Sequence, residues 1–383
     1  MNFTFSDTHE MIRTTARDFA RDEIASSVIE RDKNGVFPKE IVQKLGELGF
    51  LGMMVPEQWG GAGLDALSYV IAMEEISKID ASVGVIMSVN NSLVCWGLET
   101  YGNDDQKERF LRPLASGQKL GAFCLSEPEA GSDATQQHTS ATQNENGDWV
   151  LNGTKNWITN GTSADTYIVF AQTNRELRHK GITCFIVDRN TPGFEPGLKE
   201  DKLGIRSSDT CSIGLTNVVV PKENILGEVG KGFYIAMESL NGGRIGIASQ
   251  ALGIAQGAFE RSVEYAKQRK AFGKPIAELQ AIQIKIAEMA TKVEAARLLV
   301  YKAATMKDKH ERFVKEAAQA KLLASKFAVE VALEAIQVHG GYGYVREYQV
   351  ERLLRDSKIT EIYEGTSEIQ HIVIARELIK DLQ

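Results

Sequence analysis

A glutamate in the segment Ile362–Ser367 has surroundings in which a carboxylate could act as a base. Glu364 stands immediately before Gly365, and Thr366 or Ser367 could cap a helix that begins there. If the carboxylate were desolvated, its affinity for protons would rise toward the range that proton removal requires. A glutamate beside a helix start is also favoured by the helix dipole, and for this segment alone that structural role is the better explanation.

Two segments carry groups that suit the edges of a planar polar ring. Phe123–Ser132 combines hydroxyls, a proline that fixes a turn, and a Gly-Ser pair with free backbone donors. Trp157–Thr159 places a large aromatic surface beside a hydroxyl and backbone amides. Taken separately, the first could be an ordinary capped turn, and the second a core tryptophan beside a surface threonine.

Two further segments could approach phosphate groups. Arg269 lies in Lys267–Lys274, a cation-rich loop after a helix, and the planar fork of arginine can bind two oxygens at once. Gln337–Gly343 interrupts a long helix with glycines, which permit left-handed backbone and close approach of a ligand. Cations also gather at helix C-termini for structural reasons. His339 by itself is more often an interior histidine than a catalytic one.

Other patterns with known chemistry are incomplete in this sequence. Gly61–Ala66 fits the loose GxGxxA dinucleotide pattern, but no alternating strand–helix series follows it, so we expect a plain loop. The histidines form no HExxH pair, and we predict no metal. The cysteines match no CxxC or zinc spacing and are expected to be small buried packing groups: Cys95, Cys124, Cys184 and Cys211.

The composition limits the classes of partner. The formal net charge is −7 and the pI about 5.6, so nucleic acid and anionic membranes are poor default partners. No signal peptide is visible in Met1–Glu10, and no run is read as membrane-spanning. The expected location is therefore cytoplasmic, or the mitochondrial matrix if this is a mature organellar form.

Hydrophobic periodicity predicts helices in the first third of the chain and strands after it. Apolar residues recur at helical spacing from Met11, and Ser68–Ser77 is another expected helix. From about Gly121, short β-branched runs separated by turn residues predict a small β-domain. Its expected strands are Tyr167–Ala171, Thr183–Val187, Val218–Val220 and a hairpin over Ser140–Leu151, closed by a two-residue turn at Asn146-Gly147.

Beyond Phe233 the periodicity becomes helical again. Three long apolar stripes advance by three or four residues, and a fourth helix is expected after Gly365. Four such helices indicate an antiparallel bundle. The predicted domains are residues 1–118, helical; residues 119–230, β; and residues 231–383, a helical bundle that carries Glu364.

The six segments stand in the order seen in the acyl-CoA dehydrogenase family, and the resemblance covers essentially the whole chain. It implies a mainly α fold with a β-barrel-like middle domain and a C-terminal four-helix bundle. The sequence is most similar to short-chain, butyryl-CoA-type members. The resemblance further implies FAD as cofactor, an acyl-CoA substrate, electron-transfer flavoprotein as acceptor and a homotetramer.

The resemblance also implies roles for particular residues. Those expected around the flavin ring are Phe123, Leu125, Ser126, Gly131, Ser132, Trp157, Ile158 and Thr159. Those expected at the FAD pyrophosphate and adenosine, often across a subunit interface, are Arg269, Phe272, Gln280, Gln337, Val338, His339, Gly340 and Gly341. Thr366, Ser367 and Glu368 would also bind FAD. The expected substrate contacts are Ser132, Asn241, Gly242, Gly243, Arg244 and Gly365.

Glu364 matches the catalytic base of the family. By resemblance it would remove the α-proton, while its backbone N–H and a flavin ribityl hydroxyl stabilise the thioester oxygen. Loss of the β-hydrogen to flavin N5 would give trans-2-enoyl-CoA. Some members place their base at the position of Gly243, which cannot serve here. Asn241 and Glu129 depart from the commoner aspartate and small residue at these positions.

Two other functions fit the same pattern of residues. One is an enzyme of the same fold that passes electrons directly to oxygen, because sequence does not reveal solvent access to a reduced flavin. The other is a non-catalytic relative that binds flavin or nucleic acid. The acidic balance and the presence of Glu364 count against the second.

Overall fold

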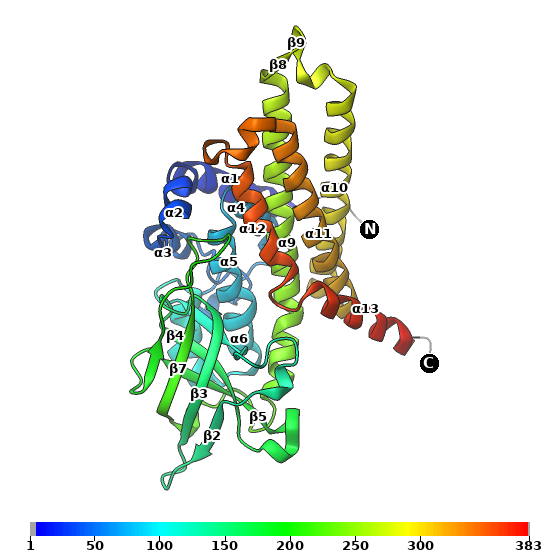
Figure 1. The fold of residues 1–383 in the computed structure, drawn as a ribbon. Coiled ribbons are helices and arrows are strands. Elements are labelled where there is room, and N and C mark those ends of the chain that lie inside the picture. The colour runs from blue at the N-terminus through cyan, green and yellow to red at the C-terminus, as the bar shows by residue number, and fades with distance from the viewer. Residues whose placement is uncertain (1–4, 382–383) are drawn as a thin grey trace.

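The N-terminal part of the molecule is helical, as its periodicity predicted. The computed structural model describes residues 5–381 and shows the larger sheet at one end of the molecule, with the N-terminal helices next to it and the long C-terminal helices extending away (Figure 1). Ser6 caps the first helix by accepting a hydrogen bond from the backbone N–H of His9. The helices are α1 (Asp7–Phe19), α2 (Val28–Asn34), α3 (Lys39–Glu47), α4 (Ala66–Ile79), α5 (Ala81–Ser88), α6 (Trp96–Tyr101), α7 (Asp104–Gln106) and α8 (Arg112–Ala115).

One stretch of this part is apolar enough to cross a membrane by length and composition, which the sequence reading overlooked. Ala81–Tyr101 spans 21 residues with a mean hydropathy of 1.3, and 94% of its apolar window is buried inside the protein. It forms α5, the π-helical segment η4 (Val89–Cys95) and α6. The stretch is a core element because other helices and strand β1 pack around it.

The middle part is a curled seven-stranded sheet, whose hydrogen-bonded path runs β1-β4-β2-β3-β7-β6 with β5 paired to β4. Strand β4 is buried at every position because neighbouring elements cover both of its faces. The predicted strands at residues 167–171, 183–187 and 218–220 lie within β4, β5 and β7, respectively. The strands are β1 (Gly121–Cys124), β2 (Ser140–Gln143), β3 (Trp149–Thr159), β4 (Thr166–Gln172), β5 (Ile182–Asp188), β6 (Phe194–Pro196) and β7 (Thr210–Val220).

The predicted hairpin exists, but its predicted two-residue turn is wrong. The last cross-strand pair is Gln143 with Trp149, so five residues form the connection. The side-chain oxygen of Asn144 accepts hydrogen bonds from the backbone N–H groups of Asn146 and Asp148, both at 3.0 Å. This side-chain closure replaces the tight turn, and only Gly147 of the expected pair has a positive φ.

The C-terminal part is built on the 37-residue helix α9 (Gly232–Gln268). Helices α10 (Gln280–Asp308) and α11 (Val314–His339) pack against it, and α4 covers another side. A small hairpin, β8 (Lys270–Ala271) and β9 (Lys274–Pro275), joins α9 to α10. The short helix α12 (Val350–Lys358) crosses α9 and α11.

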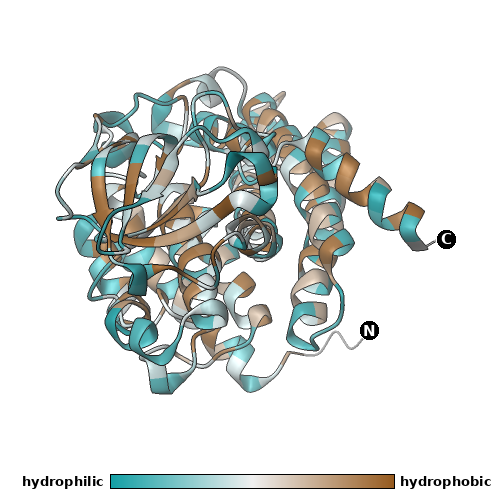
Figure 2. Cartoon of the chain, turned by 90° about the horizontal axis from the view of Figure 1, so that it is seen from below, coloured by the Kyte–Doolittle hydropathy of each residue, from teal (hydrophilic) through white to brown (hydrophobic). Residues whose placement is uncertain are grey.

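The fourth predicted helix of the bundle is α13 (Ser367–Asp381), which packs on α11 and then projects away from the other three (Figure 1). Apolar segments remain visible along it in the view of Figure 2. Ile372, Leu378 and Ile379 are 51%, 45% and 58% exposed. The outer half of α13 therefore leaves apolar surface uncovered within one chain.

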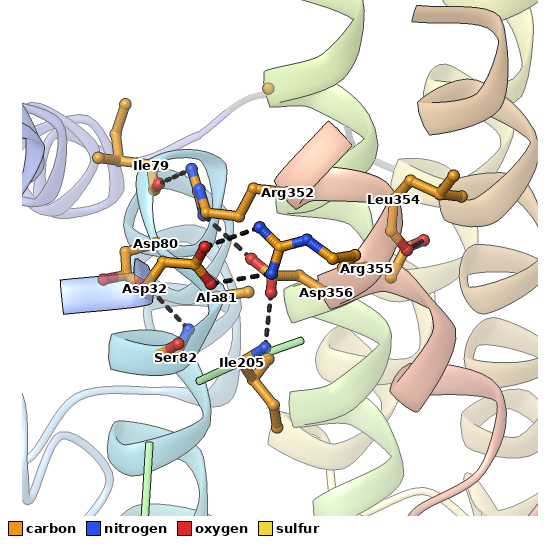
Figure 3. A network of polar contacts seen from close by, with 12 residues as sticks. Asp32, Ile79, Asp80, Ala81, Ser82, Ile205, Arg352, Leu354, Arg355 and Asp356 are labelled. Carbon is orange, nitrogen blue, oxygen red and sulfur yellow. Dashed lines mark hydrogen bonds and ion pairs between the residues drawn. The ribbon is translucent and has the colours of Figure 1, made fainter. Parts of the chain in front are cut away.

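A polar network on α12 joins the three parts of the molecule (Figure 3). The guanidinium of Arg355 donates two hydrogen bonds, of 3.0 and 2.7 Å, to the carboxylate of Asp32 on α2. Asp356 accepts a 2.6 Å hydrogen bond from the backbone N–H of Ile205 in the middle part. Arg352 donates to Asp356 and to the carbonyl of Ile79 at the end of α4. Helix α12 thus fixes the relative position of helical and sheet parts.

All four cysteines are buried and free, as their sequence spacing predicted. Burial raises the pKa of each thiol above its ordinary value. The predicted plain loop at Gly61–Ala66 is also confirmed, since helix α4 begins only at Ala66. Gly61 is required there because a Cβ would lie 2.2 Å from the carbonyl oxygen of Val55.

We expect Arg355→Met to lower the free energy of unfolding by roughly 3 kcal/mol, because it leaves the carboxylate of Asp32 partly buried without its partner. The urea midpoint measures this loss. The control is Arg21→Met, which removes an exposed arginine that pairs with Asp18 and Asp22 and should lower the urea midpoint much less. Equal losses in the two variants would contradict the role of Arg355.

Candidate active site

Glu364 lies on a short turn between two helical segments. The 3-10 segment η12 (Ile359–Glu361) follows α12, and α13 begins at Ser367. Glu364 has a φ of +52° and Gly365 a φ of +93°, so two successive residues occupy the left-handed region. The hydroxyl of Thr366 accepts a 3.4 Å hydrogen bond from the backbone N–H of Ile369, which matches one of the two predicted caps.

The carboxylate of Glu364 is enclosed although the residue as a whole is only partly buried. Its Oε2 atom is buried and has no hydrogen-bond partner among the described residues. Burial raises the pKa of Glu364 to about 7, and the positive charges of Lys321 and Arg244 limit the rise. A carboxyl group with this pKa can be ionised near neutral pH and still bind a proton strongly, which suits a general base.

Helix α9 passes directly beside this carboxylate. A Cβ built on Gly243 would lie 2.0 Å from Oε2 of Glu364 and 2.9 Å from Leu93 Cδ2. Glycine at 243 therefore leaves the space that the Glu364 side chain occupies. The structure brings Gly243 and Gly365 together with Glu364, whereas Gly242, the preceding residue of α9, faces Lys307 and the carbonyl of Ser92.

Arg244 and Asn241 form a buried polar pair on the same helix. The guanidinium of Arg244 donates a 2.5 Å hydrogen bond to the side-chain oxygen of Asn241, while its Nε atom has no partner among the described residues. Burial lowers the pKa of Arg244, and the negative charge of Glu364 opposes that change. Asn241, where the family more often has an aspartate, is thus accommodated, because its side-chain oxygen still accepts a hydrogen bond from Arg244.

The two segments predicted to hold a planar ring meet in the structure. The backbone N–H of Asn156 donates a 2.9 Å hydrogen bond to the carbonyl of Ser126. Trp157 lies near the end of strand β3 with a φ of +60° and is 62% exposed, so it is no core tryptophan. Phe123 and Leu125 are partly or fully buried at the start of this region, Ile158 is buried, and Gly131 and Ser132 lie on its exposed rim.

A buried ion pair behind these segments was not predicted. Lys155 is fully buried, and its ammonium donates to Glu127 at 2.7 Å, to Gln137 at 3.1 Å and to the carbonyl of Leu125 at 3.3 Å. Glu127 also accepts from the backbone N–H groups of residues 138 and 139. The pair fixes the loop that carries Leu125 and Ser126. The departure Glu129 is exposed and lies 3.5 Å from His138.

The residues predicted to contact phosphate gather at the far end of α9. Arg269, Val338, His339, Gly340 and Gly341 line a cavity of about 640 Å³. His339 is buried, its Nδ1 hydrogen-bonds the carbonyl of residue 335, and its ring stacks on residue 265. Nothing lies within 4 Å of a Cβ built on either glycine, so the backbone is open to a ligand.

Three other predicted residues surround that end without lining the cavity. Phe272 is 91% exposed at the tip of the small hairpin, and Gln280 and Gln337 are exposed at the ends of α10 and α11. A phenylalanine so exposed is available to contact a ligand or another protein surface.

The two groups of predicted cofactor residues are too far apart to bind one molecule within a single chain. Gly243, beside Glu364, and Gln268, beside Arg269, are separated by 25 residues of α9. At about 1.5 Å per residue, the separation along this straight helix is roughly 38 Å, further than one FAD molecule extends. The donors, exposed aromatic surfaces and open glycines suit a flavin dinucleotide only if another copy supplies the second group.

Comparison with known proteins agrees with this architecture. The N-terminal, middle and C-terminal domains of acyl-CoA dehydrogenase match residues 6–118, 122–218 and 230–379. The chain therefore belongs to the acyl-CoA dehydrogenase family and is an oxidoreductase of that class. The predicted family and fold class are confirmed.

Its similarity to particular relatives is high over the full length. It is 53% identical to the mitochondrial short-chain specific acyl-CoA dehydrogenase of Rattus norvegicus, over 98% of this chain and 90% of that protein. The butyryl-CoA dehydrogenase structure of Megasphaera elsdenii superposes with a TM-score of 0.98 at 49% identity, covering 99% and 100% of the chains. A chain in the structure described as the electron transferring flavoprotein of Acidaminococcus fermentans gives 0.98 at 46% identity, with the same coverage.

We expect Glu364→Gln to gain stability relative to the unchanged protein as the pH rises. The folded pKa of about 7 exceeds the ordinary 4.5, so the stability contributed by protonated Glu364 is lost between about pH 4.5 and 7. Glutamine has no such loss, and the gain should reach about 1–3 kcal/mol above pH 7. Thermal midpoints at pH 5 and 8 measure it. Exposed Glu145→Gln serves as control; an identical pH dependence in both variants would contradict the burial of an ionised Glu364.

Proposed function

We propose that this protein catalyses FAD-dependent α,β-dehydrogenation of a short-chain acyl-CoA to trans-2-enoyl-CoA. The observation that carries the proposal is the enclosed, unpartnered Oε2 of Glu364 in a member of this family. A buried carboxylate without a hydrogen-bond partner is costly, so its retention points to a task in which a substrate proton completes the site. The high identity to short-chain members supports a short acyl chain.

In the proposed reaction, Glu364 removes the α-proton of the thioester. Its backbone N–H is the proposed donor to the thioester oxygen as enolate character develops. Ser132, Asn241, Gly242, Gly243, Arg244 and Gly365 are the proposed substrate contacts. FAD, when bound, would supply the acceptor for the β-hydrogen as hydride. Because the carboxylate is enclosed, water is kept away from the oxygen that would accept the substrate proton.

The proposed FAD site is shared between two copies of the chain. One copy would supply Phe123, Leu125, Ser126, Gly131, Ser132, Trp157, Ile158, Thr159, Thr366, Ser367 and Glu368. The other would supply Arg269, Phe272, Gln280, Gln337, Val338, His339, Gly340 and Gly341. The distance along α9 supports this division, and the exposed Phe272 and the apolar face of α13 suit contacts between copies. We propose a homotetramer, with electron-transfer flavoprotein as acceptor, in the cytoplasm or the mitochondrial matrix.

The first test is anaerobic reduction of the bound flavin by butyryl-CoA, monitored through the absorbance of the flavin. We expect rapid bleaching in the unchanged protein and a rate at least roughly 10³-fold lower in Glu364→Gln, which loses both the base and its charge. The variant should keep FAD and still bind acyl-CoA. Near-normal reduction in Glu364→Gln would refute the assigned role, and a purified protein without flavin that retards duplex DNA would favour the non-catalytic relative.

The second test distinguishes a dehydrogenase from an oxidase of the same fold. After reduction, we expect slow reoxidation by air and fast reoxidation by electron-transfer flavoprotein. Turnover measured with acyl chains from C4 to C16 should fall as the chain lengthens beyond the short-chain range. Rapid reoxidation by air with no preference for the flavoprotein would defeat the dehydrogenase assignment.

A further inference from the structure

A lysine on α11 is buried against the turn that carries Glu364. Lys321 is 0% exposed, and its ammonium donates a 2.7 Å hydrogen bond to the carbonyl oxygen of Gly365. No other hydrogen bond or ion pair of this ammonium is found among the described residues. It lies in an apolar stripe with Ala317, Ala320 and Ala324, where a charged residue is costly. A buried lysine with one backbone partner requires a compensating charge.

The charges that act on Lys321 come from several elements. Among them Glu364 has the largest favourable effect and Arg244 opposes it. Tyr363, the residue before Glu364, donates a hydrogen bond to the side chain of Gln250. Burial nevertheless lowers the pKa of Lys321 to about 8, so it is charged where Glu364 becomes ionised. The remaining groups that face the pair are Arg244 from α9, Tyr69 from α4, Glu361 from η12 and Glu368 from α13.

The turn needs an anchor because its backbone is unfavourable. A glutamate at a φ of +52° costs of order 1–3 kcal/mol relative to ordinary backbone, and the following carbonyl would be free to rotate. That carbonyl, on Gly365, accepts from both Lys321 and the side chain of Gln370, each at 2.7 Å. Ser325, one turn further along α11, donates to the carbonyl of Thr360 just before the turn. Helix α11 therefore holds the turn at two points.

We propose that Lys321 is a positioning residue for the base: its ammonium fixes the Glu364–Gly365 turn and its charge keeps the enclosed carboxylate ionised. This inference rests on the proposed function of Glu364. Lys321 reaches no reacting atom in the proposal and acts only through Glu364. Two separable contributions follow, a hydrogen bond to a carbonyl and a positive charge, and different substitutions remove them.

Three variants separate these contributions in the FAD-loaded protein. Lys321→Met removes donor and charge, Lys321→Gln keeps a donor without charge, and Lys321→Arg keeps both. The rate of flavin reduction by butyryl-CoA is measured from pH 5.5 to 9. In Lys321→Met and Lys321→Gln the acid limb of the pH–rate profile should move to higher pH by about 1 pH unit, since the carboxylate has lost an opposite charge. The Arg variant should keep the limb in place.

The maximal rate reports the hydrogen bond. We expect it to fall roughly 10- to 100-fold in Lys321→Met, where the turn is released, and to be retained within a few-fold in Lys321→Gln. The matched control is Lys202→Met. Burial also lowers the pKa of Lys202 to about 8, its ammonium likewise donates to one backbone carbonyl, that of Ser208, and Glu364 is not among the charges that act on it. The acid limb of this variant should not move. A limb that stays fixed in Lys321→Met and Lys321→Gln would overturn the inference.

A stability measurement tests the charge without any turnover. We expect Glu364→Gln to increase the thermal midpoint at pH 8 more in the Lys321→Met background than in the unchanged protein, because ionised Glu364 costs more without its partner. Equal increases in the two backgrounds would overturn the charge contribution. If the unchanged protein is not reduced by any acyl-CoA, the proposed function fails, whereas this double-mutant comparison still decides whether the two groups interact. Flavin content and thermal midpoints identify any variant that fails to fold. If Lys321→Met fails to fold, the comparison of Lys321→Gln with Lys321→Arg decides whether the charge of Lys321 matters.

Discussion

A carboxylate that must be negative to accept a proton is enclosed by protein, and this conflict governs the candidate site. Burial alone would keep Glu364 protonated, and a direct ion pair would make it a weak base. The fold places two cations, Lys321 and Arg244, near enough to favour the charge, while Oε2 of the carboxylate has no hydrogen-bond partner among the described residues. The resulting pKa of about 7 lies between these extremes. Any change in cation distance or burial would move that balance.

Helices α9 and α12 hold the carboxylate of Glu364 in a fixed position. Helix α9 passes Glu364 at Gly243 and ends roughly 38 Å further on. One continuous helix therefore links the site of the proposed base to a cavity that another copy would use. Helix α12, which precedes the turn with Glu364, is hydrogen-bonded to Asp32 and Ile79 in the N-terminal part and to Ile205 in the middle part. The turn therefore follows a helix of the C-terminal part that is fixed to the other two.

The sequence predicted the architecture well because long apolar stripes and β-branched runs report burial directly. It assigned roles to Glu364, Gly243 and Trp157 through the family resemblance. The structure brings Gly243 beside Glu364, whereas the roles of all three residues and the domain limits at residues 118 and 230 remain predictions. It could not find Lys321 or Lys155, because a single lysine looks like the edge of the stripe on a helix, as in α11, or like the exposed face of a strand, as in β3. The five-residue hairpin loop was missed because the side chain of Asn144, not the Asn-Gly pair, closes it.

The network on α12 has a consequence for how the enzyme would lose activity under stress. Arg355 and Asp356 tie α12 to residues 32 and 205, and the turn with Glu364 begins a few residues later. If either the first helices or the sheet detached locally, α12 would lose these hydrogen bonds, and the turn with Glu364 would then depend on its contacts with α11. Activity would then be lost at a lower temperature or denaturant concentration than the helical signal. A preparation could look folded by circular dichroism after the turn that carries Glu364 had already lost its position.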